Sequence, residues 1–179
     1  MIELVFGGSA SGKSDFAETE ILKFCSQKNY YIATMKVFGK EEEERICRHK
    51  KMRSGKGFIT IEQSENLENA LLKADKKTLK KSSALVECLS NLCANEMFTS
   101  GKKDFNLAEK RILKGIDILC SSFENVVFVS ANVFSDGEKY TDETLAYMRI
   151  LGKVNSYISQ RAQKIVELVA GIPVFIRSR

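Results

Sequence analysis

Eight residues near the start of the chain match a complete phosphate-binding loop. They fit the pattern G-x-x-x-x-G-K-[ST] and are, in order, Gly7, Gly8, Ser9, Ala10, Ser11, Gly12, Lys13 and Ser14. In such a loop, backbone N–H groups and the dipole of the following helix surround the phosphates of a nucleotide. Lys13 is expected to reach the β- and γ-phosphates, and Ser14 to ligate Mg²⁺. The alternative is a glycine-rich turn with an exposed lysine, but the complete motif favours a nucleoside triphosphate site.

A nucleotide site of this kind needs a second acidic group to hold the metal, and Glu87 is the best-placed candidate. It closes the apolar run of residues 84–86, which is typical of a buried strand. The metal-binding acid of a P-loop protein usually stands at the end of a strand near the loop, although an aspartate is commoner there. The alternative for Glu87 is a strand-end acid that faces solvent.

His49 is the only histidine in the chain. Arg45 lies four residues before it and Arg53 four residues after it, so all three would share one face of a continuous helix. Two neighbouring cations favour the neutral, nucleophilic imidazole, and they would also bind phosphates. A helix C-terminus acts in the opposite direction and favours the imidazolium. The pattern is compatible with a covalent histidine–phosphate role and also with an ordinary surface histidine.

The elements that must position these residues follow from the hydrophobic pattern. Short apolar or alternating runs predict strands at residues 2–6, 30–33, 58–61, 84–86, 126–129, 165–170 and 174–176. Helical periodicity predicts helices at residues 14–27, 41–51, 67–74, 112–123 and 142–164. Strands that alternate with helices predict an α/β fold, with a mostly parallel sheet covered on both faces.

The same pattern predicts the organisation of the chain ends and loops. The last two strands flank a turn at residues 171–173, which favours a hairpin at the edge of the sheet. Residues 100–106 read as a polar loop. Because the sequence contains neither a linker nor an internal repeat, we expect residues 1–179 to form a single nucleotide-binding domain.

Composition and charge narrow the class of ligand. Hydrophobic residues make up 44% and charged residues 28% of the chain, as in an ordinary globular protein. The net charge of +5 suits anionic ligands such as nucleotides. The lysine-rich residues 73–81 include no aromatic residue for base stacking, which favours a solvated helix face over a nucleic-acid-binding patch.

Cysteine usage and hydropathy predict the cellular environment. The chain has five cysteines and no C-x-x-C pair, which argues against a disulfide framework and against a zinc site. No run of 18 apolar residues predicts a transmembrane helix, and the N-terminus lacks the basic region of a signal peptide. We therefore expect a cytoplasmic protein with reduced thiols and no stable membrane insertion.

Several motifs occur in a characteristic order along the whole chain. They are the phosphate loop, Tyr31-Ile32-Ala33-Thr34, Arg45-Ile46-Cys47-Arg48-His49, Leu85-Val86-Glu87-Cys88-Leu89-Ser90, Gly152-Lys153-Val154-Asn155 and Val169-Ala170-Gly171-Ile172-Pro173. Together they resemble the bifunctional adenosylcobinamide kinase / adenosylcobinamide-phosphate guanylyltransferase family of cobalamin biosynthesis. The phosphate loop alone is generic, whereas the second, third and fourth motifs make the resemblance specific.

The resemblance implies a RecA-like, mostly parallel sheet in a homotrimer with two transferase activities, and ATP, GTP and Mg²⁺ as their substrates and cofactor. The first activity phosphorylates the aminopropanol hydroxyl of adenosylcobinamide. The second moves GMP from GTP onto that phosphate through a guanylylated histidine and releases pyrophosphate. The resemblance assigns the guanylylated residue to His49 and the strand-end acid to Glu87. It aligns Glu62 with the acid of the family's T-x-E motif. We therefore assign Glu62 to nucleotide binding, together with Arg45 and Arg53, whose spacing around His49 suits phosphates.

Three segments depart from the usual family pattern. They lie at Ser54, at residues 131–134 and at Met148-Arg149, all away from the phosphate loop. One alternative is therefore a divergent family member that retains a single activity. Another, from a different functional class, is a P-loop regulatory NTPase in which His49 has no chemical role.

Overall fold

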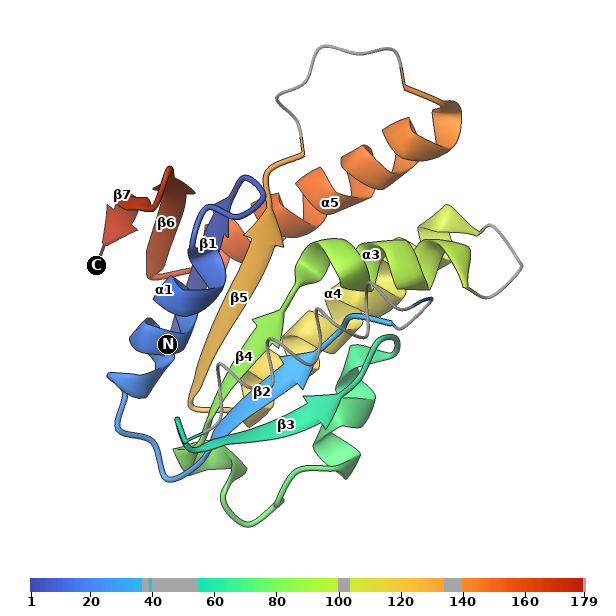
Figure 1. Cartoon of the computed structure of the whole chain (residues 1–179). Coiled ribbons are helices and arrows are strands. Elements are labelled where there is room, and N and C mark those ends of the chain that lie inside the picture. The colour runs from blue at the N-terminus through green and yellow to red at the C-terminus, as the bar shows by residue number, and fades with distance from the viewer. Residues whose placement is uncertain (37–38, 40–54, 100–103, 134–139, 179) are drawn as a thin grey trace.

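The computed structural model describes residues 1–36, 39, 55–99, 104–133 and 140–178. They form a sheet of strands with helices packed against it (Figure 1). Their bounds are β1 (Ile2–Gly7), α1 (Lys13–Leu22), β2 (Asn29–Ala33), β3 (Phe58–Glu62), η1 (Leu67–Leu72), η2 (Leu79–Lys81), β4 (Ser83–Glu87), α3 (Leu89–Phe98), α4 (Phe105–Ser122), β5 (Asn125–Ala131), α5 (Asp142–Arg161), β6 (Lys164–Val169) and β7 (Ile172–Ser178), where η marks a 3₁₀ helix.

The seven strands of the described residues form one sheet in the order β3-β2-β4-β5-β1-β6-β7. Every neighbouring pair from β3 to β6 is parallel. The last strand, β7, runs antiparallel to β6 at the edge of the sheet. This architecture confirms the predicted α/β fold class, a mostly parallel sheet with a C-terminal edge hairpin.

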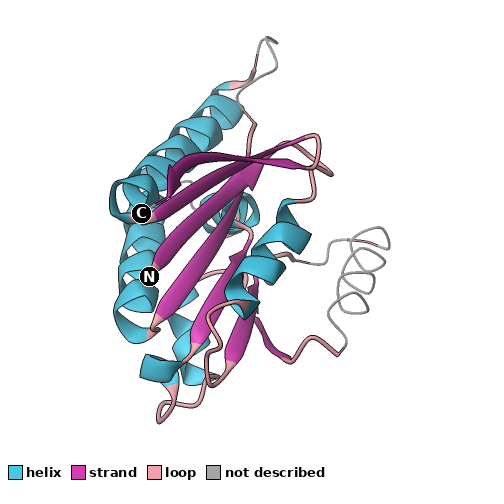
Figure 2. Ribbon diagram, turned by 90° about the vertical axis from the view of Figure 1, so that its left-hand side faces the viewer, coloured by secondary structure: helices cyan, strands magenta, loops and turns pink. Residues whose placement is uncertain are grey.

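Side chains along each central strand alternate between two buried clusters on opposite faces of the sheet. In β4, Ala84 and Val86 belong to one cluster, and Leu85 belongs to the other. Helix α1 covers the face of Leu85, whereas α3, α4 and α5 cover the opposite face (Figure 2). Burial on both faces explains why β4 and β5 are almost uninterrupted apolar runs in the sequence.

The segment predicted as a helix at residues 67–74 is instead the shorter 3₁₀ helix η1. Leu67 and Ala70 are still buried, and they bring η1 onto α4. A Cβ atom on Gly115 of α4 would lie 2.9 Å from the Leu67 Cβ, so a glycine is needed for this close approach. The lysine-rich residues that follow form turns and the 3₁₀ helix η2, and not the predicted helix face.

Other helix boundaries also differ from the prediction. Helix α1 ends at Leu22, five residues early, and Cys25 beyond it has a positive φ of 50°. The polar loop predicted at residues 100–106 extends too far, because Phe105 is already the first residue of α4. Helix α5 ends at Arg161, and Lys164, predicted as its last residue, begins β6.

Helix α3 was not predicted from the sequence. Five of its six buried residues, Leu89, Leu92, Cys93, Glu96 and Met97, have the spacing of a single helix face, and only Asn95 lies outside it. The polar Glu96 interrupts the apolar stripe on which amphipathic periodicity depends, and the buried Asn95 adds a second polar position. No helix in the described residues is long and apolar enough to cross a membrane.

Candidate active site

The phosphate loop joins the end of β1 to the start of α1, as the motif requires. Gly7 has no room for a side chain, because a Cβ there would lie 2.5 Å from the Leu168 carbonyl oxygen and 2.7 Å from the Ser11 Oγ. Gly12 has a φ of 83°, in the left-handed region that favours glycine. Both glycines of the motif are therefore explained by the local geometry.

The loop presents positive potential at the N-terminus of α1. Gly12 occupies the N-cap position, and no side chain caps the helix there. The first N–H groups of a helix have no intrahelical partner, so a phosphate is well suited to accept their hydrogen bonds. The Lys13 ammonium lies across the loop and donates to the Gly8 carbonyl oxygen at 2.7 Å.

Glu87 contacts the phosphate loop directly. The Ser14 hydroxyl donates a hydrogen bond to Glu87 Oε1. The second carboxylate oxygen, Oε2, is buried and accepts no hydrogen bond from any residue that the structure describes. A buried acceptor beside a hydroxyl oxygen fits the oxygen-donor preference of Mg²⁺, which usually takes one or two protein ligands together with substrate phosphates. These two residues would thus hold the metal predicted from the sequence.

The position of Glu87 follows from strand alternation. Leu85 belongs to the cluster beneath α1, and Glu87 is two residues further along β4 on the same face. β4 and β1 are both parallel to β5, which lies between them, so their carboxyl ends meet at one edge. Burial raises the pKa of the adjacent Cys88 thiol, which keeps it protonated and a poor ligand for Mg²⁺.

Glu62 ends β3 at the same edge of the sheet. Ala33 of β2 stands in register with Glu62 on one side and with Glu87 on the other. Residues in register point to the same face, so both carboxylates lie on the α1 face. They are separated by two strand spacings, about 10 Å. β3 is also four strand positions away from β1, which carries the loop. Glu62 is thus an acidic group at the same edge of the sheet, too far from Glu87 to bind the same metal ion with it.

The sequence did not predict a role for Asn95, which links the loops that follow β2 and β3. Its buried side-chain amide donates to the Thr34 carbonyl oxygen at 2.8 Å and to the Ser64 carbonyl oxygen at 3.1 Å. The Thr34 hydroxyl in turn donates to the Cys88 carbonyl oxygen at 2.8 Å. This network fixes the two loops relative to the end of β4. The signal that could have identified Asn95 from the sequence is a polar residue among the buried positions of a helix.

A family model described as cobinamide kinase / cobinamide phosphate guanyltransferase matches residues 3–176. The chain belongs to this family. None of the curated protein sequences matches the chain.

Two solved structures were found to be similar to this family member at low sequence identity. A KaiC-like protein from Pyrococcus horikoshii is 11% identical with a TM-score of 0.57, and the match covers 99% of this chain and 80% of that chain. The flagellar accessory protein FlaH from Methanocaldococcus jannaschii is also 11% identical, with a TM-score of 0.49 and coverage of 99% and 78%. The first likeness supports the P-loop NTPase-like fold and nothing finer.

The structure of this cobinamide kinase / guanyltransferase family member brings some of the predicted site residues together. Ser14 and Glu87 are in contact, and Lys13 lies in the same loop as Ser14. The predicted helix at residues 41–51 and the residues His49, Arg45 and Arg53 lie outside the described residues. Among the residues that are described, no group of three or more His, Cys, Asp or Glu side chains forms a metal site.

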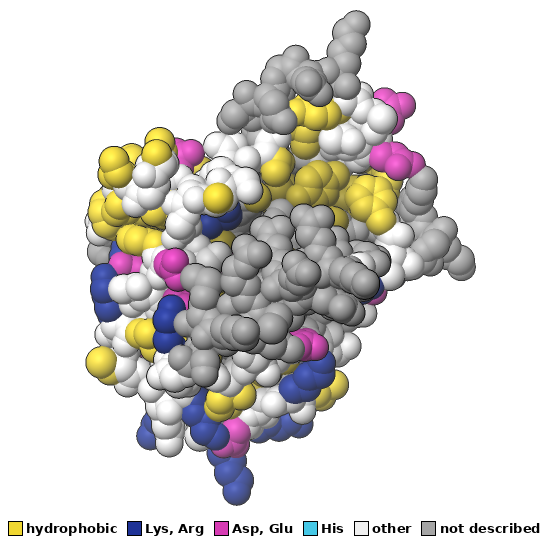
Figure 3. All heavy atoms as spheres, in the orientation of Figure 1, with side chains coloured by type: hydrophobic (Ala, Val, Ile, Leu, Met, Phe, Trp, Pro, Cys, Tyr) yellow, Lys and Arg dark blue, Asp and Glu magenta, His cyan; other side chains and the backbone are white. Residues whose placement is uncertain are grey.

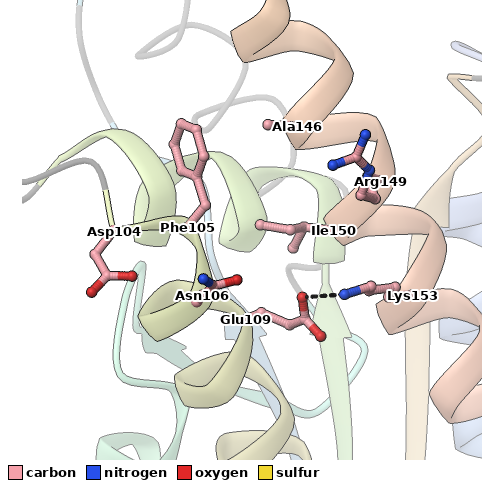
Figure 4. Close-up of a pocket in the computed structure, with 8 residues that line it drawn as sticks. All are labelled: Asp104, Phe105, Asn106, Glu109, Ala146, Arg149, Ile150 and Lys153. Carbon is pink, nitrogen blue, oxygen red and sulfur yellow. Dashed lines mark hydrogen bonds and ion pairs between the residues drawn. The ribbon is translucent and has the colours of Figure 1, made fainter.

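A cavity of about 420 Å³ lies between α4 and α5, on the face of the sheet away from α1 (Figure 4). Its lining is mixed in charge, and Glu109 forms an ion pair with Lys153 at 2.8 Å across it. Arg149, which belongs to a segment that departs from the family pattern, is one of its lining residues. The cavity contains none of the predicted site residues, so it is separate from the nucleotide site.

Proposed function

We propose that the protein phosphorylates adenosylcobinamide with a nucleoside triphosphate and then transfers GMP from GTP to the product. The observation that carries this proposal is the family match over residues 3–176. The contact between Ser14 and Glu87 supports it, because a kinase needs a metal-binding pair beside its phosphate loop. The proposal includes a homotrimeric assembly, as the resemblance implies.

In the kinase step, the acceptor hydroxyl of adenosylcobinamide attacks the γ-phosphorus of the triphosphate. The oxygen–phosphorus bond forms, the bond to the β-bridging oxygen breaks, and the hydroxyl proton is released. Lys13 and the N–H groups of the phosphate loop bind the phosphate oxygens and orient the γ-phosphorus. When bound, Mg²⁺ neutralises charge on the phosphates, and Ser14 and Glu87 are the residues that would hold it.

In the guanylyltransferase step, a neutral His49 imidazole attacks the α-phosphorus of GTP and pyrophosphate leaves. The resulting phosphoramidate is then attacked by a phosphate oxygen of adenosylcobinamide phosphate, which releases the histidine. Covalent catalysis of this kind divides one difficult transfer into two easier ones. Arg45 and Arg53 would bind the phosphates of GTP and favour the neutral imidazole.

The test is covalent labelling with GTP that carries the label on its α-phosphate. The wild-type protein should retain the GMP label after denaturation, and the bond should be labile in acid and stable in alkali. Because His49 is the only histidine, His49→Ala should abolish labelling completely while ATP binding at the phosphate loop remains.

Two outcomes contradict the guanylyltransferase assignment. They are a wild-type protein that takes no label and a His49→Ala protein that still does. The altered segment 131–134 begins at Ala131, the last residue of β5, at the edge of the sheet that carries the loop. Its departure from the family pattern favours the kinase-only alternative in that case.

A further inference from the structure

The C-terminal hairpin makes close contact with the phosphate loop. A Cβ on Gly7 would lie 2.5 Å from the carbonyl oxygen of Leu168 in β6, and a Cβ on Gly12 would lie 4.0 Å from the Cα of Gly171. The first and sixth residues of the loop therefore rest against the end of β6 and the turn that follows. In that turn Ala170 has a φ of 49° and Gly171 a φ of 83°. Two successive positive φ angles are typical of a tight two-residue hairpin turn.

The hairpin turn and Glu87 lie on opposite sides of the phosphate loop. In the sheet order, β4 is two strands away from β1 on one side, and β6 is its immediate neighbour on the other side. Ser14 and Glu87 mark the end of the site that belongs to the terminal phosphates. The nucleoside at the other end of a bound triphosphate therefore leaves the loop on the side where the hairpin turn stands.

The turn places backbone and apolar side chains where the nucleoside of a bound triphosphate would lie. Pro173 stands in register with Leu168, which is buried in the cluster beneath α1, so Pro173 lies on the α1 face. Ile172 stands in register with Val169, one residue along β6 from Leu168, and lies on the opposite face. Figure 3 shows apolar side chains gathered over β6 and β7. A lining of this kind suits the faces of a base and a ribose, and it offers no charge to a phosphate.

The hairpin is held in place independently of any ligand. The Arg177 guanidinium of β7 donates to the carbonyl oxygens of Ser159 and Ala162, at 2.5 and 3.1 Å, where α5 ends. These bonds satisfy carbonyl groups that a helix end otherwise leaves unpaired. The turn is therefore positioned beside the loop before a nucleotide arrives.

We propose that Ala170, Gly171 and Pro173 form the nucleoside-binding wall of the phosphate-loop site. The wall takes the base and ribose of a purine nucleoside triphosphate, while the loop takes its phosphates. This inference rests on the proposed function for the identity of the nucleotide.

The experiment compares binding of ATP and of inorganic tripolyphosphate to the full-length protein by calorimetry, both in the presence of Mg²⁺. Pro173→Ser should weaken ATP binding about five- to tenfold, as expected for the loss of one small apolar contact. It should leave tripolyphosphate binding unchanged, because tripolyphosphate has no nucleoside. Ile172→Ser is the matched control on the other face, where the side chain is 67% exposed, and it should change neither affinity.

Pro173→Val keeps an apolar side chain and should restore ATP binding, which separates loss of the contact from damage to the strand. Three outcomes would contradict the proposed nucleoside-binding wall. Pro173→Ser could weaken the binding of ATP and tripolyphosphate equally, or it could weaken neither. Ile172→Ser could also weaken ATP binding as much as Pro173→Ser does. A wild-type protein that binds ATP no more tightly than tripolyphosphate would also overturn the wall. A wild-type protein that binds neither ligand would overturn the proposed function itself.

Discussion

At the scale of single residues, the site depends on a carboxylate whose hydrogen bonding is incomplete within the described chain. Oε1 of Glu87 accepts the Ser14 hydroxyl, and Oε2 is buried without a hydrogen bond from any described residue. Leaving a buried acceptor unsatisfied costs stability, and such groups are rare in native proteins. Glu87 Oε2 lies beside a phosphate loop, where a bound cation would be its missing partner. This explains why the cost is tolerated.

We predict that Glu87→Gln lowers phosphoryl transfer by about 100-fold or more, because the amide keeps the volume of the side chain and loses the charge that binds Mg²⁺. Thermal stability should be equal or higher, since a buried charge is removed. Activity as a function of Mg²⁺ concentration, together with thermal melts, measures both effects.

Glu96→Gln is the control for the loss of a buried carboxylate. Glu96 is 4% exposed, accepts the Asn66 backbone N–H at 2.5 Å and lies 3.7 Å from the Arg111 guanidinium. A glutamine can still accept the N–H but loses the ion pair, so the substitution should lower stability and leave the Mg²⁺ response unchanged. A Glu87→Gln enzyme with a normal Mg²⁺ dependence would remove Glu87 from the metal site.

Lys13→Ala should weaken ATP binding by about 10- to 100-fold, the range expected for the loss of a hydrogen bond to a charged group. The fold should be retained, because the ammonium bonds to a carbonyl of the loop itself, that of Gly8. Calorimetry with ATP checks the affinity. Lys114→Ala, on a side chain of α4 that is 69% exposed, removes the same charge elsewhere, and equal affinities in the two variants would contradict the assignment.

At the scale of elements, β1, α1 and β6 are joined by a small group of charges around two buried glutamates, Glu3 and Glu20. Glu3 of β1 is 2% exposed, and Glu20 of α1 is bonded to both Lys23 and Lys164. Burial raises the pKa of Glu3, with Lys164, Lys23 and the N-terminal amine opposing this shift and Glu20 adding to it. Glu3 is thus a buried acid that holds its proton more tightly in the folded state than in the unfolded state.

The raised pKa of Glu3 predicts a pH dependence of stability. The folded state binds this proton more tightly than the unfolded state does, so the slope of stability with pH is negative between the two pKa values. Protonated Glu3 contributes its full stabilisation below the unfolded pKa, and the contribution is lost as pH rises through the folded pKa.

Glu3→Gln mimics the neutral acid, so its stability relative to the wild type should be lowest near pH 4 and should increase toward neutral pH. Urea denaturation at a series of pH values measures the difference. Glu124→Gln, at an exposed glutamate on the turn before β5, should follow the wild-type curve. A constant difference between Glu3→Gln and wild type across this range would contradict the prediction.

At the scale of the whole molecule, β7 leaves an apolar edge on the sheet. Val174, Phe175 and Ile176 are 45%, 55% and 58% exposed. Exposed apolar edge strands promote association unless they are covered. They are therefore candidates for the subunit contact of the homotrimer that the family resemblance implies.

We predict a trimer in solution and its dissociation by Ile176→Lys, which places a charge in this contact. Sedimentation velocity at micromolar concentration measures the assembly state of both proteins. Val133→Lys, at a half-buried residue that follows β5 well away from β7, is the control and should remain trimeric. A wild-type protein that is a stable monomer would contradict the proposed subunit contact through β7.

The sequence by itself determined the local features of this protein. The phosphate loop between a strand and a helix, Glu87 at the end of a buried strand and the C-terminal hairpin follow from motifs and periodicities that span fewer than about 20 residues. These signals depend only on residues that are close in the sequence, so the features can be predicted without knowledge of the tertiary structure. The role of His49 stays a prediction, because its segment lies outside the described residues.

Only the tertiary structure decided which of these features meet. Ser14 and Glu87 are 73 residues apart in the sequence, and their contact results from the order and parallel register of β1, β5 and β4. The approach of Gly171 to Gly12 likewise depends on β6 standing beside β1. Strand order is set by the packing of the whole core and leaves no periodic trace in the sequence, so such contacts between distant residues are known only once the chain has folded.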